Sequence, residues 1–109
     1  MKKSKQNSKI ISLREINKIL KEHKEKLKEK YKIKEIGVFG SYVRGEQKKK
    51  GSDVDILVEF NDEDIPDLLK FIEMEMYLKK LLKKKVDLVR KGGIRQELKD
   101  IVLNEVIYL

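Results

Sequence analysis

The sequence predicts an α/β (α+β) fold in which a small mixed β-sheet of about four strands is flanked by helices. Two observations predict this class. Apolar residues make up 39% of the 109 residues and occur in compact blocks separated by charge, as in folded rather than disordered chains. The blocks alternate between helical and strand spacing, which is typical of helices packed on a mixed sheet. The length favours a single domain, residues 12–109, preceded by a flexible basic arm at residues 1–11.

The first helix is predicted from Ser12 to about Lys30. Ser12 and Glu15 form a capping-box pattern, in which the hydroxyl and the carboxylate satisfy free N–H groups at the helix start. His23 is the only histidine, and we interpret it as a boundary residue beside the buried stripe, so that a site with several histidines is excluded. The apolar residues at helical spacing are expected to face the core: Leu13, Ile16, Ile19, Leu20 and Leu27.

Two strands follow, separated by a glycine turn and a basic loop. Residues 32–39 (KIKEIGVF) predict the first strand, which Gly40 and Ser41 end; a short helix or turn is expected at 42–46 and a basic loop at 47–51. Residues 53–60 (DVDILVEF) predict the second strand, which is expected to be central because its middle is apolar on both faces. Alternation places Val54, Ile56, Val58 and Phe60 on one face and Asp53, Asp55, Leu57 and Glu59 on the other.

The rest of the chain predicts two more helices and two more strands. After an acidic turn at 61–64, Pro66 is expected in the first turn of a helix, where its missing N–H costs nothing. Lysines near the end of this helix suit its dipole. Residues 86–89 (VDLV) predict a strand, residues 94–103 a helix and residues 106–109 (VIYL) a short final strand. The core stripe of the helix after Pro66 is expected to be Leu68, Leu69, Ile72, Met76 and Leu81.

Composition excludes several classes of protein. The chain has no cysteine, which rules out disulfides and thiolate metal sites. No apolar run approaches the roughly 20 residues of a membrane span, and no apolar segment follows the basic N-terminus, so we expect a cytoplasmic protein without a signal peptide. The net charge of +8 favours an anionic partner, which could be a nucleotide, a nucleic acid or an acidic protein surface.

Asp53 and Asp55 are the strongest candidates for chemistry. Two positions apart on a strand, their carboxylates share one face and resist joint ionisation, because like charges repel. A hard cation relieves this conflict, and Mg²⁺ commonly takes one or two carboxylates together with phosphate oxygens and water. The alternative, two solvated aspartates at a sheet edge, fits poorly with a central strand and with the low strand propensity of Asp.

Two further features gain meaning from this pair. Asp87 is the one acid in the apolar strand 86–89; if that strand lies beside 53–60, three carboxylates could converge and hold two divalent ions about 4 Å apart. Asp87 could equally be a strand-end residue bonded to backbone or to a lysine. Gly40 lets the backbone approach a ligand closely, and the N–H groups and the Ser41 hydroxyl could bind phosphate, although Gly-Ser after a strand is also ordinary turn chemistry.

These residues together resemble a known family. Gly40-Ser41 followed by Asp53-x-Asp55 resembles the signature of the polymerase β-like nucleotidyltransferases. The stretch 38–60 (VFGSYVRGEQKKKGSDVDILVEF) is similar to the minimal nucleotidyltransferases in particular, small proteins often encoded beside a HEPN-domain toxin that act as its antitoxin. The acid in VDLV and the Glu-Val-Ile-Tyr segment near the C-terminus also fit this family. The loop at 47–51 is one residue longer than is usual, where insertion is well tolerated.

The resemblance implies a polymerase β-like fold, an activity and a set of roles. Gly40 and Ser41 would hold the nucleotide phosphates, and Arg44 could contact phosphate or the partner. Asp53 and Asp55 would bind two Mg²⁺ ions, with Asp87 as third carboxylate, placed to help deprotonate the acceptor. The reaction would transfer AMP from ATP to a hydroxyl, releasing pyrophosphate. In a type VII toxin–antitoxin pair, the acceptor would be a tyrosine of a HEPN-type toxin that assembles with this chain.

Two other functions stay open from the residues. The same fold could neutralise a toxin by binding alone, but a pure binder has no need of buried acids. A basic nucleic-acid-binding module would need a basic stripe interleaved with aromatic side chains, and the seven aromatic residues lie mostly in core-like positions. Lys48, Lys49 and Lys50 could meet a triphosphate or an acidic partner, or form a solvated basic turn.

Overall fold

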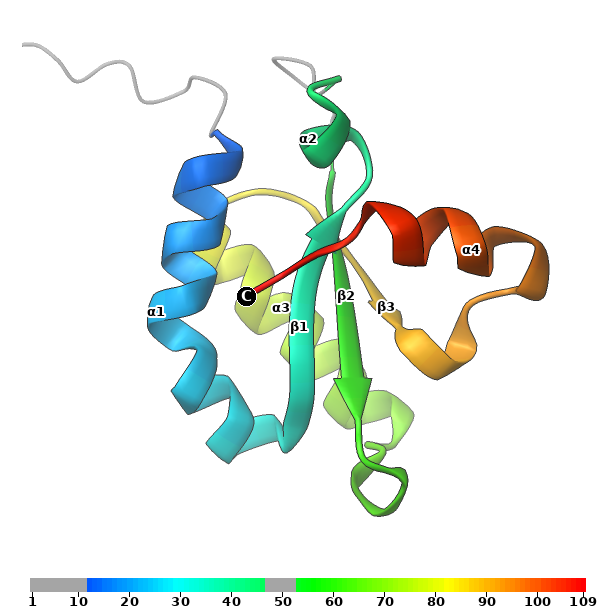
Figure 1. Ribbon diagram of the computed structural model, residues 1–109. Helices are drawn as coiled ribbons and strands as arrows, with labels where there is room; N and C mark the ends of the chain where they lie inside the picture. Colours follow the sequence, from blue (N-terminus) through cyan, green and yellow to red (C-terminus); the bar gives the residue numbers. More distant parts are fainter. Residues whose placement is uncertain (1–11, 47–52) are drawn as a thin grey trace, which may run out of the picture.

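The computed structural model describes residues 12–46 and 53–109 and confirms the predicted mixed sheet with flanking helices. The predicted arm at 1–11 and the basic loop at 47–51 lie outside these residues. In chain order the elements are α1 (Leu13–Tyr31), β1 (Ile33–Phe39), α2 (Ser41–Arg44), β2 (Val54–Phe60), η2 (Asp62–Asp64), α3 (Leu68–Leu82), β3 (Val86–Arg90), η3 (Lys91–Gly93), α4 (Gln96–Glu105) and β4 (Ile107–Tyr108) (Figure 1).

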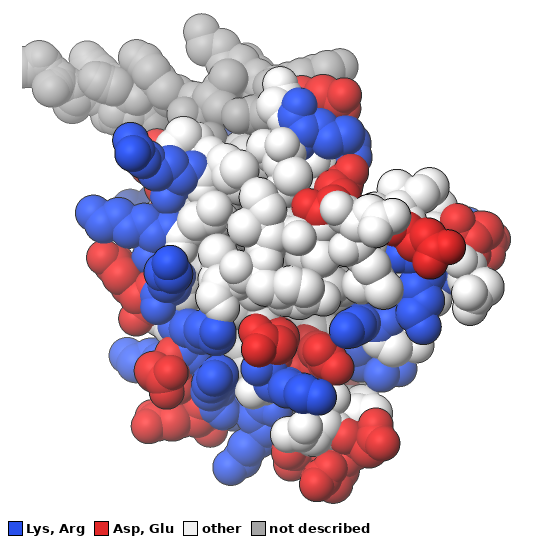
Figure 2. All heavy atoms as spheres, viewed as in Figure 1, with Lys and Arg blue, Asp and Glu red and all other residues white. Residues whose placement is uncertain are grey.

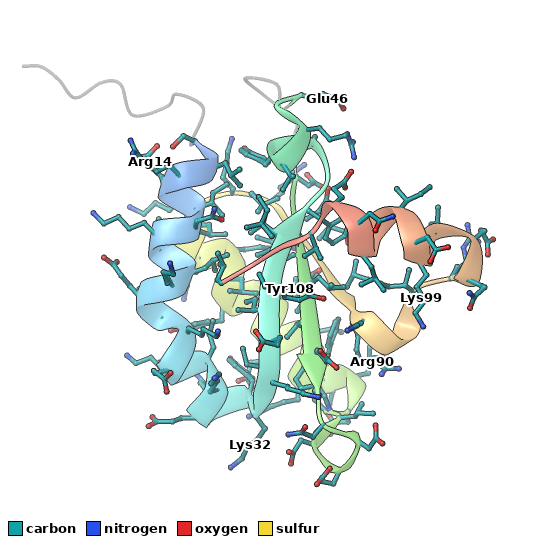
Figure 3. All side chains as sticks on the ribbon, viewed as in Figure 1. Arg14, Lys32, Glu46, Arg90, Lys99 and Tyr108 are labelled. Atoms are coloured by element: carbon teal, nitrogen blue, oxygen red, sulfur yellow. The ribbon has the colours of Figure 1, made fainter. Side chains whose placement is uncertain are left out.

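The sheet has the strand order β3-β2-β1-β4, so β2 is an interior strand, as predicted. It pairs antiparallel with β1 and parallel with β3, while β1 also pairs antiparallel with the short β4. The helices α1 and α3 pack against one face of the sheet and against each other, and α4 lies apart from both (Figure 1). On the opposite face lies Tyr108, which Figure 3 labels in front of β1 and β2. Together with Glu35, Glu59 and Lys91 it lines a shallow depression.

The core forms where β2 and the two long helices meet. The predicted inner face of β2 is confirmed, and Leu57 on the other face is also fully buried. The capping box of α1 is present: the Glu15 N–H donates to the Ser12 hydroxyl and the Ser12 N–H to the Glu15 carboxylate, each at 3.1 Å. The predicted stripe of α1 is confirmed, since Ile16, Leu20 and Leu27 are fully buried and Leu13 and Ile19 pack against the core.

The predicted core stripe of α3 is wrong for four of its five residues. The exposed fractions are 71% for Leu68, 79% for Leu69, 41% for Ile72 and 61% for Met76, and Leu81 alone packs partly against the core. The helix instead buries Met74, Leu78 and Leu82, which also recur at helical spacing. Because α3 is apolar on more than one side, periodicity offers two stripes and does not decide which one faces the sheet.

The start of α3 also differs from the prediction. Pro66 precedes the helix, and Asp67 is the N-cap, its side chain accepting the Lys70 N–H at 2.8 Å. An N-cap carboxylate satisfies a free N–H, which a proline in the first turn does not. The last helix spans Gln96–Glu105 rather than 94–103, and β4 is the predicted final strand. Within the described residues, no helix is long and apolar enough to cross a membrane.

The orientation of α3 predicts that neighbouring methionines differ in their effect on stability. Met74 is fully buried and Met76 is 61% exposed. We expect Met74→Ala to lower the free energy of unfolding by about 2–5 kcal/mol, because it leaves a cavity in the core. Met76→Ala should change it by less than about 0.5 kcal/mol. Urea denaturation in dilute solution measures both; a larger loss for Met76→Ala would contradict the orientation.

Candidate active site

The turn between β1 and α2 brings Gly40 against the carboxylate of Asp55. Gly40 has φ +81° and ψ −152°, a conformation that residues with a side chain rarely adopt. A Cβ at this position would overlap the Asp55 carboxyl group. The carbonyl of Gly40 accepts the N–H groups of Val43 and Arg44, which begins the short helix α2, and the buried Tyr42 anchors that helix in the core. Glycine is therefore required at residue 40 for two reasons: the backbone has a positive φ, and the Asp55 carboxylate occupies the position of a Cβ atom.

The predicted acids meet at one end of the parallel strands β2 and β3. Asp55 on β2 is paired in register with Asp87 on β3, and its other neighbour is Phe39 at the end of β1. Asp53 lies one residue before β2 begins. Asp55 is half-buried, whereas Asp53 and Asp87 are exposed. Strand 86–89 does lie beside strand 53–60, which was the condition for the carboxylates to converge, and the charges of Asp53 and Asp87 act on Asp55.

The surroundings of Asp55 make its ionisation unfavourable. Burial raises the pKa of this carboxyl most, and the negative charges of Asp87 and Asp53 raise it further. The Arg44 guanidinium lowers the pKa and Glu105 raises it again, and the result is a pKa of about 6. Within 12–46 and 53–109, no three acidic or histidine side chains form a ready-made metal cage. The site is instead a half-buried carboxylate with two exposed carboxylates near it.

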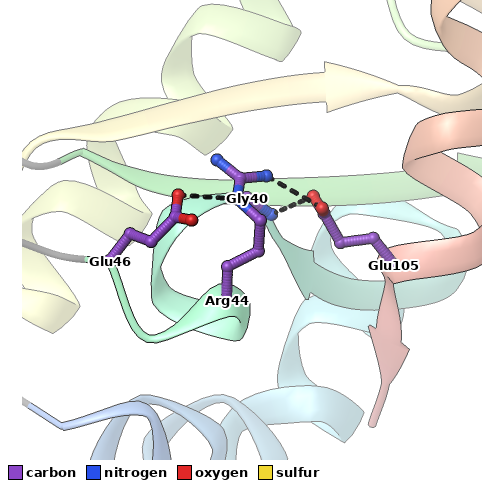
Figure 4. Close-up of polar contacts among 4 residues, drawn as sticks. All are labelled: Gly40, Arg44, Glu46 and Glu105. Carbon is purple, nitrogen blue, oxygen red and sulfur yellow. Dashed lines mark hydrogen bonds and ion pairs between the residues drawn. The ribbon is translucent and has the colours of Figure 1, made fainter.

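Glu105, at the end of α4, is a site residue that sequence reasoning did not single out. One of its oxygens accepts the Gly40 N–H at 2.7 Å, and the other accepts Nη1 of Arg44 at 2.8 Å (Figure 4). Arg44 also donates through Nε to Glu46 at 2.8 Å, and these carboxylates raise its pKa further. Glu105 is the more buried of the two acids, with 14% of its side chain exposed against 62% for Glu46.

The position of Glu105 explains why it was missed. It contacts Gly40 across 65 residues of sequence, so no local spacing connects them. The one signal was the likeness of the Glu-Val-Ile-Tyr segment to the minimal nucleotidyltransferases. Ser41, the remaining predicted phosphate-binding residue, is the first residue of α2 and is half-buried next to Gly40. The structure therefore brings together all six predicted site residues and adds a seventh.

The fold resembles that of a solved structure of a putative minimal nucleotidyltransferase, with a TM-score of 0.74 and 28% identity over 91% of this chain and 97% of that one. The sequence pattern of the nucleotidyltransferase domain matches residues 20–109, and the chain belongs to this family. It is 54% identical over 100 residues to the protein adenylyltransferase MntA of Thermococcus cleftensis, covering 92% of this chain and 98% of that protein. The predicted resemblance is confirmed, and the protein is a nucleotidyltransferase.

Two solved structures extend the comparison. A toxin–antitoxin structure with AMP-PNP has a TM-score of 0.68 and 31% identity, over 85% of this chain and 70% of that one. A tri-AMPylated Shewanella oneidensis HEPN toxin in complex with MNT antitoxin gives a TM-score of 0.59 and 27% identity, over 85% of this chain and 66% of that one. The fold of this chain is therefore also found in proteins of toxin–antitoxin complexes.

The raised pKa of Asp55 predicts a specific dependence of stability on pH in the metal-free protein. Its ordinary pKa is 3.8 and its folded pKa is about 6, so the folded state holds this proton more tightly than the unfolded state does. The contribution of Asp55 is therefore most favourable below its unfolded pKa and is lost as pH rises through about 6. Asp55→Asn should remove this loss and melt at a higher temperature than the wild type at pH 7.

Thermal melts in EDTA from pH 4 to pH 7 measure this effect as the difference in melting temperature between the wild type and Asp55→Asn. Taking the difference removes the contributions of the other titrating groups, which the two proteins share. Asp100→Asn, at an exposed acid of α4, is the matched control and should leave the pH profile unchanged. A variant that melts lower than the wild type throughout would mean that the Asp55 carboxylate stabilises the fold.

The two carboxylates that bind Arg44 are predicted to be unequal. Glu105→Ala leaves the Gly40 N–H without its acceptor, and we expect it to lower the free energy of unfolding by about 1–3 kcal/mol. Glu46→Ala removes a mostly exposed pair and should have a much smaller effect. Glu105→Gln retains an acceptor for the N–H and should recover most of the loss. Equal effects of Glu105→Ala and Glu46→Ala in urea denaturation would exclude a special role for the Gly40 contact.

Proposed function

We propose that this protein is a Mg²⁺-dependent protein adenylyltransferase, which transfers AMP from ATP to a hydroxyl, most simply a tyrosine, of a HEPN-type toxin and so acts as its antitoxin in the cytoplasm. The observation that carries the proposal is the half-buried Asp55 beside Asp87 and Asp53, whose pKa is raised to about 6. A folded chain that holds acids this way gains from a divalent cation, because the cation removes the repulsion among the carboxylates.

The side chains fit magnesium in their chemistry. All of the proposed donors are carboxylate oxygens, which this hard cation prefers. Mg²⁺ keeps several waters and takes only one or two carboxylates along with substrate phosphates, so a site without a three-residue cage suits it. Asp53 and Asp55 would hold the metal, with Asp87 able to join them. When bound, the metal would neutralise charge on the phosphates and on the departing pyrophosphate.

The chain's own residues have separate tasks in this reaction. The backbone at Gly40 and the hydroxyl of Ser41 would hold the phosphates, and the Arg44 guanidinium would balance their charge. The acceptor oxygen attacks the α-phosphorus and forms a new P–O bond, while the bond from the α-phosphorus to the bridging oxygen breaks and pyrophosphate leaves. Asp87, exposed and in register with Asp55, would accept the proton of the acceptor hydroxyl.

Similar proteins support the partner and the nucleotide. The relative from Thermococcus cleftensis is a protein adenylyltransferase, and one similar structure contains an AMPylated HEPN toxin with an MNT antitoxin. Another toxin–antitoxin structure contains AMP-PNP, an ATP analogue. The presence of Asp53, Asp55 and Asp87 favours catalysis over neutralisation by binding alone, since binding has no use for acids whose charges repel.

The proposal predicts that labelling of the toxin depends on the paired acids. The protein is incubated with Mg²⁺, ATP labelled at the α-phosphate and a HEPN-type toxin. We expect label on the toxin, and a loss of at least about 100-fold with Asp53→Asn/Asp55→Asn, because the charges that hold the cation are gone. Asp100→Asn should label as the wild type does.

Three outcomes distinguish the parts of this proposal. Replacing the acceptor tyrosine of the toxin by phenylalanine should abolish the label while complex formation persists. Undiminished labelling by a folded double variant would overturn the assigned acids. Neutralisation of the toxin with no label on it would indicate the binding-only function, and label on RNA alone would indicate a different acceptor.

A further inference from the structure

The outer side of α3 carries an apolar stripe that no described part of the chain covers. Four large side chains on it, Leu68, Leu69, Ile72 and Met76, are between 41% and 79% exposed, and Ile65, just before the helix, is 45% exposed. Their spacing of three and four residues forms a narrow band along one side of the helix, which is typical of a seam between two packed helices. Contiguous exposed apolar surface of this kind marks an interaction site more often than a free surface.

A groove runs beside this stripe. It lies between α3 and the end of α1, has a volume of about 420 Å³, and is lined by Tyr31 and Tyr77 together with three stripe residues. Lys30 and Lys80 stand at its margin, and the Lys30 ammonium lies 5.5 Å and 5.2 Å from the centres of the two tyrosine rings. Glu73 also lines the groove, where it accepts a hydrogen bond from the Tyr31 hydroxyl and pairs with Lys70. The groove therefore accepts an apolar side chain, and charges of both signs surround it.

Charge is separated along the length of α3. Immediately before the helix, η2 is a run of three acids, Asp62–Asp64, and the helix ends beside Lys80, Lys83 and Lys84. Among residues 12–46 and 53–109, none of these six side chains has an opposite charge within 4.0 Å. The apolar stripe thus lies between an acidic end and a basic end, both of which lack partners in the described chain.

Two copies of this surface in antiparallel orientation are complementary, because apolar stripe meets apolar stripe and each acidic end meets a basic end. We propose that the outer side of α3 binds a second copy of this chain, with the two α3 helices antiparallel and the two-fold axis near Ile72. This arrangement places Met76 of one copy beside Leu68 of the other, and Lys80 near Asp64. The acidic end of each helix then faces the basic end of the other, whereas a parallel pair would bring like charges together.

The dimer leaves both candidate active sites open. The helix α3 packs on the sheet face that carries Val54, Ile56 and Val58, whereas Asp55 alternates onto the opposite face. The two acidic sites therefore point away from the interface, and the proposal holds whether or not the chain transfers AMP. A second exposed apolar group lies elsewhere, on α4 and β4, and consists of Leu98, Ile101, Ile107 and Tyr108. Figure 2 shows a broad area without Lys, Arg, Asp or Glu on the face of the molecule that it presents.

The test is the mass of the isolated protein in solution, measured by sedimentation equilibrium over a range of concentrations. We expect the wild type to be a dimer. Leu69→Lys and Met76→Lys should each raise the dissociation constant of the dimer at least about tenfold, because they place a cation in an apolar contact. Both positions are more than 60% exposed, so circular dichroism should show an intact fold. Ile101→Lys, at a residue 59% exposed on α4, is the matched control and should remain dimeric.

Charge reversal tests the antiparallel orientation. Lys80→Glu alone should weaken the dimer, and Asp64→Lys/Lys80→Glu in the same chain should restore it, since each reversed end again meets its opposite. A wild type that stays monomeric at all concentrations would overturn the proposal, as would loss of the dimer in Ile101→Lys but not in Met76→Lys. A monomer whose binding to the HEPN-type toxin is lost in Met76→Lys would assign the surface to that partner instead.

Discussion

The contact between Gly40 and the carboxylate of Asp55 is the constraint on which the candidate site depends. An interior strand is an expensive place for a charge, and Asp55 can lie there only because residue 40 has no side chain and its backbone turns at positive φ. The same turn begins α2 and so places Arg44 near the acids. The absence of a side chain at Gly40 therefore determines the positions of the Asp55 carboxylate, of the turn into α2 and of Arg44.

Part of this arrangement follows from local sequence rules. Alternation along 53–60 put Asp55 on the face opposite to the core, and the apolar middle of the strand indicated its interior position, both of which the structure confirms. Whether the VDLV strand lies beside strand 53–60 was left open by the sequence, and the structure shows that it does. The two predictions for strand 53–60 succeeded because both signals are local. The alternation of side chains between the two faces of a strand, and the apolar character of its middle, can be read from a few consecutive residues.

Other features depend on contacts that no local pattern encodes. The helix α3 has apolar residues on two sides, and only packing against the sheet selects Met74, Leu78 and Leu82 for the core. Glu105 reaches Gly40 because α4 and β4 return the chain to β1, and a glutamate at the end of an amphipathic helix looks like any solvated residue. The metal-binding role of the acids comes from chemistry and family resemblance, and it stays a prediction.

The link between Glu105 and Gly40 has a consequence for synthesis of the protein. Gly40, Asp55 and Asp87 leave the ribosome before Glu105 does, and the contact of Glu105 with Gly40 spans 65 residues. The segment after α4 is held to β1 by pairing of Ile107 with Val38 and by the Leu109 N–H, which donates to the Ile36 carbonyl at 3.0 Å. A nascent chain thus carries Asp53, Asp55 and Asp87 before Glu105 is available to accept the Gly40 N–H. Assembly of the site is therefore a late event in vectorial folding.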